Sequence, residues 1–382
     1  MLRLGIERIG EFAGCFSGKR LGMITSVSGT DRRLRSSVEI LQERYPLAAL
    51  YAPEHGIRGA ADAGEILEDE PEADAATGLP VFSLYRGDGQ RLTAAMVEGV
   101  DALVYDIQDL GLRFYTYCST LAYALEDCAR YGKELVVLDR PAPLGGLRVE
   151  GGLLKKGFES FVGCYDLPVR YGLTAGELAK MLNAEKRLGC ALSVVPMSGW
   201  RRSMLFPELG YPFLMPSPSI PNFHNALLYA GTCLFEGTNL SEGRGTSDPF
   251  ALLGAPFIDA RGLCAAIERL QLPGVIATPA TFTPTTGKYA GEGCQGVHLH
   301  LTDAEAYPAV EAGVLMLDTV RSLYPGRFAF RPPQQEGERP MIDLLSGGDE
   351  LRGGMPARTL LENWRSQSAA FLTRSLPYRL YD

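Results

Sequence analysis

Short apolar runs alternate with amphipathic segments along the first third of the chain. The runs are almost continuously apolar, which is typical of strands buried on both faces of a parallel sheet. The segments between them repeat apolar positions every three to four residues, as an amphipathic helix does. This order of strands and helices favours an α/β fold with a Rossmann-like, doubly wound, mostly parallel sheet. The predicted strands are 19–25, 47–51, 79–84, 102–106 and 134–139, and the predicted helices are 38–45 and 119–131.

The pattern changes beyond residue 210. Residues 214–222 are rich in proline and extended in character, which is typical of a crossing between domains. Residues 236–246 form a polar, glycine-rich stretch that we interpret as a functional loop, and 295–301 alternate like a half-buried strand. We therefore expect a Rossmann-like catalytic domain over 1–222 and a smaller α+β domain over 223–382 that closes the active-site cleft.

Composition narrows the possible partners. The chain has 382 residues and a net charge of −8 without a long basic run, which argues against nucleic acid. No apolar run reaches the ~18–20 residues that a membrane span requires. The N-terminus lacks the apolar region of a secretory signal, so we expect a cytoplasmic protein. The eight cysteines include no Cys-x-x-Cys pair, and neither a Gly-x-Gly-x-x-Gly nor a P-loop motif is present, so we expect no cofactor.

Acidic residues follow three of the predicted strands. Glu54 lies beside His55 just after the second strand, and two glycines follow, Gly56 and Gly59. Asp106 and Asp139 end the fourth and fifth strands. The carboxyl ends of parallel strands share one edge, where ligands bind in open α/β sheets. Three carboxylates there suit paired acid–base chemistry or a metal, although a single Asp in this position is often a helix cap.

Two segments carry most of the remaining polar chemistry. Residues 105–117 combine carboxylates, an amide, a guanidinium and phenols, which together can hold a sugar through its hydroxyls and its apolar face. The alternative is that the aromatic side chains of this segment are core residues. The stretch 236–246 adds three more candidate site residues. The residues concerned are Gln108, Asp109, Arg113, Tyr115 and Tyr117 in the first segment, and Asn239, Glu242 and Arg244 in the second.

The sequence contains six motifs in this order: PEHGIRG, YDIQDLGLRFYTY, DRPAPLGG, PVRYGLTAGELA, PSPSIP and EGTNLSEGRGTSDPF. Together they resemble the NamZ (YbbC-like) exo-β-N-acetylmuramidases, a family long catalogued as a domain of unknown function. The resemblance runs from about Leu21 to the C-terminus. It implies a Rossmann-like N-terminal domain, a smaller C-terminal domain and an active site in the cleft between them. It also implies release of N-acetylmuramic acid from the non-reducing ends of peptidoglycan fragments.

The resemblance makes Glu54 the leading catalytic residue, and we assign it as the general acid. Glycoside hydrolysis usually needs a second carboxylate. Asp106 or Asp109 is the first candidate for this role, and Glu242 is a less favoured candidate. His55 could orient Glu54 or a sugar hydroxyl. Candidates for the lactyl carboxylate of muramic acid, which a bidentate arginine suits best, are Arg113, Arg140, Arg170 and Arg244. The other expected substrate-binding residues are Arg58, Gln108, Tyr115, Tyr117, Asp139 and Asn239.

The chain departs from the family at three positions. Family members commonly carry Asn where this chain has Ala142 and Ser219, and His where it has Tyr171. Each change removes an amide or imidazole from a motif that we expect near the cleft, so a related sugar or a different aglycone is conceivable.

Two alternatives remain. The first is an amino-sugar or muropeptide-binding protein with degenerate catalysis. The second is a metal-dependent hydrolase that uses Glu54, Asp106 and Asp139. His298 and His300 share one face of a predicted strand, but without a third ligand nearby in the sequence we interpret them as structural.

Overall fold

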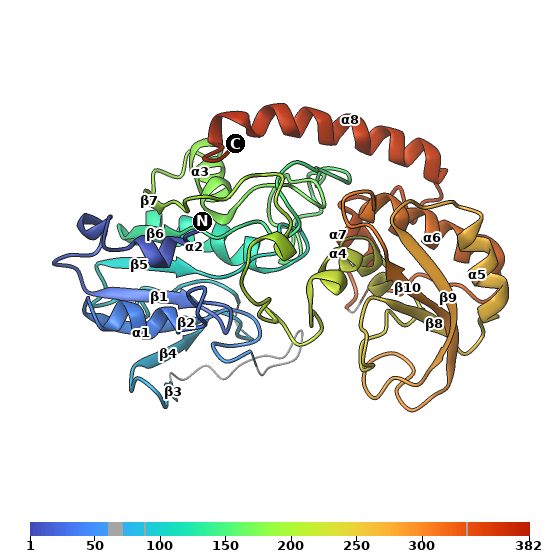
Figure 1. Ribbon diagram of the computed structural model, residues 1–382, viewed down its shortest axis with the longest axis horizontal. Helices are drawn as coiled ribbons and strands as arrows, with labels where there is room; N and C mark the ends of the chain where they lie inside the picture. Colours follow the sequence, from blue (N-terminus) through green and yellow to red (C-terminus); the bar gives the residue numbers. More distant parts are fainter. Residues whose placement is uncertain (60–71, 88, 334) are drawn as a thin grey trace.

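The computed structural model describes residues 1–59, 72–87, 89–333 and 335–382 (Figure 1). A seven-stranded sheet of order β3-β4-β2-β1-β5-β6-β7 forms the core of the N-terminal half. Neighbouring strands are parallel except for β3 and β4. Every residue of β1 and β5 is buried, as the continuous apolar runs predict. The strands are β1 (Leu21–Thr25), β2 (Leu47–Ala52), β3 (Glu72–Ala73), β4 (Pro80–Ser83), β5 (Ala102–Asp106), β6 (Glu134–Leu138) and β7 (Ala191–Val195).

The order of the strands makes the sheet doubly wound. The chain proceeds from β1 outward through β2 to β4, then returns to β5 beside β1 and proceeds the other way through β6 to β7. Since crossovers between parallel strands are right-handed, the two directions place helices on opposite faces. The predicted fold class is therefore confirmed. The sequence did not predict β7, an edge strand with only one fully buried residue and no continuous apolar run.

The helices of this half begin and end at recognisable signals. In the capping box of α3, the Thr174 side chain accepts from the amide of Glu177, and the Glu177 carboxylate accepts from the amide of Thr174. Helix α2 ends at Gly132, whose φ of 63° is left-handed. The helices are α1 (Ser37–Gln42), α2 (Tyr117–Tyr131) and α3 (Ala175–Glu185), with short 3-10 turns η1 (Gly5–Arg8), η2 (Ala13–Cys15) and η3 (Phe206–Glu208).

The C-terminal half contains an antiparallel three-stranded sheet of order β8-β10-β9. Helices α4 and α6 cross closely because two glycines meet: a Cβ on Gly231 would lie 1.9 Å from the carbonyl oxygen of Ala309, and one on Gly313 would lie 2.3 Å from that of Gly231. The elements are α4 (Phe223–Thr232), η4 (Cys233–Gly237), β8 (Leu252–Ala255), α5 (Ala260–Glu268), β9 (Val275–Phe282), β10 (Cys294–Leu301), α6 (Ala309–Leu323), α7 (Met341–Ser346), α8 (Ala357–Ser375) and η5 (Leu376–Tyr378).

The long helix α8 returns from the C-terminal half to the N-terminal half (Figure 1). The Ser368 hydroxyl donates to the carbonyl of Gly151 at 2.8 Å, and Arg374 forms an ion pair with Glu185 at 2.6 Å. The last residues of the chain thus pack against the sheet domain. We propose two domains, 1–222 and 223–382, and the end of the second domain packs against the first.

No helix in the described part of the chain is both long and apolar enough to cross a membrane.

Candidate active site

A pocket lies where the two halves of the chain meet. Its walls come from the loop after β2, the residues just before α2, the proline-rich segment, and the region from α4 to the loop after η4. Elements on both sides of the proposed domain boundary therefore build one site. The lining residues are Glu54, His55, Phe114, Tyr115, Thr116, Val162, Ser217, Pro218, Ser219, Ile220, Tyr229, Glu236, Arg244 and Phe250.

Glu54 is held by a strained turn and by a hydrogen bond. Strand β2 ends at Ala52, and the amide of Gly56 then donates to the carbonyl of Pro53 at 2.9 Å. His55 has a φ of 73°, which is unfavourable for a residue with a Cβ and is common at functional sites. The Thr116 hydroxyl donates to Glu54 Oε2 at 2.6 Å. The Glu54 carboxyl group is thus buried and fixed against the start of α2.

Arg244 and Glu236 form the opposite wall. The Arg244 guanidinium donates to Glu236 Oε1 at 2.7 Å and to the Ser219 hydroxyl at 2.8 Å. It also lies 4.9 Å from the centre of the Phe250 ring. Burial lowers the pKa of a guanidinium, but the Glu236 carboxylate outweighs this and holds the pKa of Arg244 above its usual value. Arg244 is therefore a cation in this wall of the pocket.

Aromatic rings form the rest of the pocket. Tyr229 makes edge-to-face contacts with Phe114 at 5.2 Å, with Tyr115 at 6.2 Å and with Phe250 at 4.5 Å between ring centres. Burial raises the pKa of Tyr115 well above its usual value, so its hydroxyl stays protonated. The site combines two carboxyl groups, one cation and a rigid aromatic surface.

Two of the three carboxylates expected on the sheet edge do not enter this pocket. Asp106 is fully buried and accepts two hydrogen bonds from Arg140, from Nε at 2.5 Å and from Nη2 at 2.9 Å. Asp139 is also fully buried and accepts from Thr174, Gly176 and Tyr381. All three strands end at one edge, as expected, but only Glu54 faces the cleft. We therefore correct the assignments of Asp106 as a second catalytic carboxylate and of Asp139 and Arg140 as substrate-binding residues.

Three further predicted residues are bound to the protein's own backbone. The fully buried Arg113 donates to the carbonyls of Gly152, Leu167 and Leu345. Arg170 pairs with Glu150 and donates to Leu144, and the Asn239 side chain bonds to the backbone of Arg327 and Ala329. Since these groups hold loops together and do not line the pocket, the substrate-binding roles expected for Arg113, Arg170 and Asn239 are corrected.

The remaining predicted residues do not line the pocket. The Tyr117 hydroxyl donates to the carbonyl of Pro216 at 2.8 Å, and the Gln108 amide donates to Asp109 and Pro141. Arg58 pairs with Asp74 in a separate hollow near the end of β1. Glu242 is buried between Lys288 at 2.8 Å and Arg244 at 3.6 Å. Glu242 therefore acts on the pocket through Arg244.

Asp109 is buried beneath the site. Its carboxylate accepts from the amide of Gly111 and from the Tyr171 hydroxyl, each at 3.0 Å. Burial raises the pKa of Asp109 to about 6. This geometry argues against Asp109 as the second catalytic carboxylate, since it does not line the pocket.

The raised pKa of Asp109 predicts a pH-dependent stability. The folded protein binds this proton more tightly than the unfolded chain, whose Asp has a pKa of ~3.9. Protonated Asp109 therefore stabilises the folded state relative to ionised Asp109. This contribution is fully present below the unfolded pKa and is lost as pH rises through about 6. From pH 4 to 7, the unfolding free energy of Asp109→Asn should rise relative to wild type by ~2 kcal/mol. Urea denaturation of both proteins at each pH measures this difference, and a constant difference would contradict a raised pKa.

Ten of the fourteen lining residues were not among the predicted site residues. Glu236 opens the EGTNLSEGRGTSDPF motif but was not singled out within it, and Thr116 stands among the aromatic residues of its own motif. Ser219 was noted as a departure from the family, and Tyr229 was not noted. Of the three departures from the family, only Ser219 lines the pocket: Tyr171 binds Asp109, and Ala142 lies in the interior. The motif positions carried a signal for Glu236, whereas nothing in the sequence distinguished Thr116 or Tyr229.

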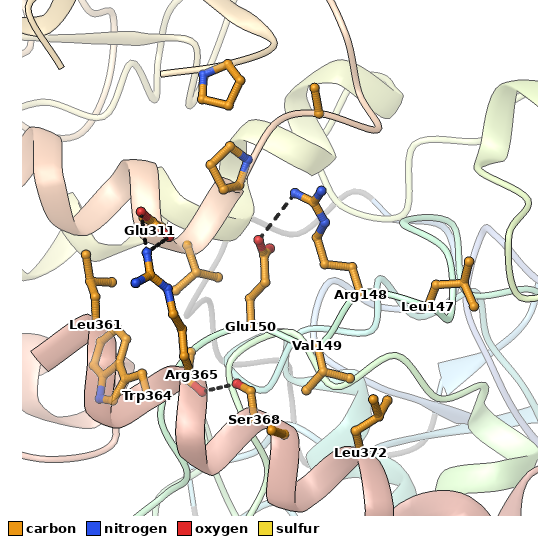
Figure 2. A pocket seen from close by; sticks show the side chains of 16 residues that line it. Leu147, Arg148, Val149, Glu150, Glu311, Leu361, Trp364, Arg365, Ser368 and Leu372 are labelled. Atoms are coloured by element: carbon orange, nitrogen blue, oxygen red, sulfur yellow. Dashed lines mark hydrogen bonds and ion pairs between the residues drawn. The ribbon is translucent and has the colours of Figure 1, made fainter. Parts of the chain in front are cut away.

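A second, more apolar groove of about 640 Å³ lies between α8, the start of α6 and residues 147–151 (Figure 2). It shares no lining residue with the Glu54 pocket. The guanidinium of Arg365 pairs with Glu311 at 2.8 Å, and that of Arg148 with Glu150 at 3.6 Å. The Arg365–Glu311 pair joins α8 to α6, and the hydrogen bond from Ser368 to Gly151 joins α8 to the N-terminal half.

The described residues contain no group of three or more His, Cys, Asp or Glu side chains that could hold a metal ion. The metal-dependent alternative requires Asp106 and Asp139 beside Glu54. In the structure, these two carboxylates are bound by Arg140 and by the donors from Thr174, Gly176 and Tyr381.

Known proteins resemble the chain over nearly its whole length. Residues 21–224 match the N-terminal and residues 227–381 the C-terminal family model of exo-β-N-acetylmuramidase NamZ. The peptidoglycan β-N-acetylmuramidase NamZ of Bacillus subtilis (strain 168) is 44% identical over 352 residues, which cover 91% of this chain and 81% of that protein.

Two crystal structures of DUF1343 family proteins from Bacteroides fragilis NCTC 9343 resemble the structure of this chain. Each match covers 100% of this chain and 99% of the matched protein chain. The first is 38% identical with a TM-score of 0.90, and the second is 28% identical with a TM-score of 0.78. The resemblance inferred from the six motifs is therefore confirmed: the chain belongs to the NamZ family of exo-β-N-acetylmuramidases.

Proposed function

We propose that this chain is an exo-acting glycosidase that releases N-acetylmuramic acid from the non-reducing end of peptidoglycan fragments, in cell-wall turnover and recycling. The observation that carries the proposal is the pocket in which Glu54 and Glu236 stand together among aromatic rings. The name of the B. subtilis relative, a peptidoglycan β-N-acetylmuramidase, supplies the substrate class. The cytoplasmic location expected from the sequence stays a prediction.

Two carboxyl groups in one pocket can divide the two roles of a glycosidase between them. Glu54 accepts a hydrogen bond from the Thr116 hydroxyl, which a carboxylic acid can accept as well as a carboxylate can. Glu236 accepts a hydrogen bond from the Arg244 guanidinium, an arrangement that suits a nucleophile or base. Glycosidases commonly use one protonated carboxyl group at the leaving oxygen and one carboxylate as nucleophile or base. We assign Glu54 as the acid and Glu236, in place of Asp106 or Asp109, as the second carboxylate.

Arg244 is the one member of the four predicted arginines that lines the pocket. Its guanidinium has five N–H donors, so it can bind a substrate carboxylate beside Glu236. We therefore retain Arg244 for the lactyl carboxylate that distinguishes muramic acid from N-acetylglucosamine.

The test is release of 4-nitrophenol from the β-N-acetylmuramide and from the β-N-acetylglucosaminide, with and without EDTA. The proposal expects turnover of the muramide alone, unaffected by EDTA, and a smaller preference for it in Arg244→Gln. Loss of turnover in EDTA would support a metal-dependent hydrolase. Binding of the muramide without turnover by folded protein would support the degenerate binding protein.

Replacement of Glu236 tests the second carboxylate. Glu236→Gln should lower kcat on the muramide by about 10²–10⁴-fold, since this is the usual contribution of a positioned acid or base. The side chain is partly exposed, at 24%, so the fold should tolerate the change. Steady-state kinetics and a thermal melt on the same sample separate the two effects. Activity within threefold of wild type would remove Glu236 from the mechanism.

A further inference from the structure

A polar groove of about 1080 Å³ adjoins the Glu54 pocket. The two share Pro218 and Ser219, so a molecule that extends out of the pocket enters the groove directly. The groove lies between the loop 245–249 and the strands β9 and β10 of the C-terminal half. Gly245 lets this loop approach closely, because a Cβ there would lie 2.5 Å from the amide nitrogen of Thr286.

The walls of the groove offer hydroxyl and amide groups and few charges. Among the described residues that line it, Asp248 and His298 are the only ionisable ones, and they bind one another at 2.6 Å. The Asn225 amide donates to the other oxygen of Asp248, also at 2.6 Å, which fixes the pair. Both side chains remain about a third exposed, at 32% and 31%. The hydroxyl- and amide-bearing residues of the walls are Ser219, Asn222, Thr246, Ser247, Thr281, Thr283, Thr285 and Thr286.

These features match a neutral sugar better than a charged peptide. A fixed carboxylate and imidazole can exchange hydrogen bonds with sugar hydroxyls, and the flat rings of Phe282 and His298 can lie against the apolar face of a pyranose. An acidic stem peptide would instead need an unpaired cation. In the part of the chain that the structure describes, no Lys or Arg lines the groove, and His298 is already paired with Asp248.

We propose that this groove is the leaving-group site and that it takes the neutral, hydroxyl-rich sugar on the reducing side of the scissile bond, held by the Asp248–His298 pair. The inference rests on the proposed function, because an exo-acting enzyme places one sugar in the pocket and must accommodate the rest of the substrate outside it. It assigns a specificity role to residues of the EGTNLSEGRGTSDPF motif that lie outside the Glu54 pocket.

The test compares two β-N-acetylmuramides, one with N-acetylglucosamine as leaving group and one with 4-nitrophenol. His298→Ala should lower kcat/KM for the disaccharide by about tenfold, mainly through KM, since hydrogen bonds from the sugar to the Asp248–His298 pair are lost. It should change kcat/KM for the aryl glycoside by less than twofold. His224→Ala is the matched control: this exposed histidine of α4 lines neither the groove nor the Glu54 pocket, and its replacement should leave both values unchanged. Equal losses on both substrates, or none on the disaccharide, would overturn the proposal.

A binding measurement keeps this test independent of turnover. Titration of the disaccharide into the Glu54→Gln protein should show at least fivefold weaker binding once His298→Ala is added. A disaccharide whose leaving sugar carries a carboxylate should bind more weakly than the neutral one. If wild type turned over neither glycoside, the proposed function would fail, while these titrations would still decide the groove. Equal affinity with and without His298 would refute the leaving-group site alone.

Discussion

Glu54→Gln is expected to lower kcat on a 4-nitrophenyl or disaccharide muramide by about 10²–10⁴-fold while leaving the fold intact. The amide has the same shape as the carboxyl group and can still accept the hydrogen bond from the Thr116 hydroxyl. It cannot deliver a proton to the leaving oxygen, which is the role assigned to Glu54. The loss should be larger for the disaccharide, because a sugar alkoxide needs protonation more than 4-nitrophenolate does.

The measurement is kcat for both substrates, with urea denaturation to show that the variant is folded. Thr116→Val is the matched control, since it removes the hydroxyl that positions Glu54 but keeps the acid. It should cost about tenfold, the effect of one hydrogen bond to a carboxyl group. A folded Glu54→Gln protein with more than a tenth of wild-type activity would exclude Glu54 as the general acid.

Asp106→Asn is expected to destabilise the protein by about 3–5 kcal/mol, because it leaves the guanidinium of Arg140 buried without its counter-ion. Asp106 and Arg140 are 0% and 3% exposed, and they form two hydrogen bonds. Breaking one partner of a buried pair costs far more than the pair itself contributes. The turnover of the molecules that stay folded should remain within tenfold of wild type, since Asp106 does not reach the pocket.

Unfolding free energies from urea denaturation and kcat at low temperature check both parts. Asp318→Asn is the control. It breaks the partly exposed ion pair between Asp318 and Arg321, which are 2.6 Å apart, and should lower the unfolding free energy by less than ~1 kcal/mol. A double variant, Asp106→Leu with Arg140→Met, should recover part of the stability, because neither charge is then left alone. A stable Asp106→Asn protein without activity would restore Asp106 as a catalytic residue.

The expected site residues divide according to whether their side chains line the pocket. Glu54, His55, Tyr115 and Arg244 line the pocket, whereas most of the other expected residues are buried polar groups that hold loops in place. Arginine and aspartate are rarely buried without partners, so a fold with long loops above its sheet uses them internally. In the sequence, Arg113 and Arg244 look equally suited to bind a carboxylate. Their surroundings differ only after folding.

The sequence by itself determined the buried strands of the sheet domain and the position of Glu54 at the edge of that sheet. Continuous apolar runs predicted the buried strands to within one or two residues, because strands covered on both faces have no polar positions to confuse the pattern. The parallel order then placed Glu54, Asp106 and Asp139 at one edge. The six motifs predicted the family.

Only the tertiary structure decided which side chains share the pocket. Glu54 and Glu236 are separated by most of the sheet domain in the sequence, and they line one pocket in which Tyr229 of α4 packs against Phe114 and Tyr115. Likewise, the pairing of Asp106 with Arg140 and the return of α8 depend on contacts between distant segments. Local patterns record burial and periodicity, whereas the partner of each polar group is settled by long-range packing.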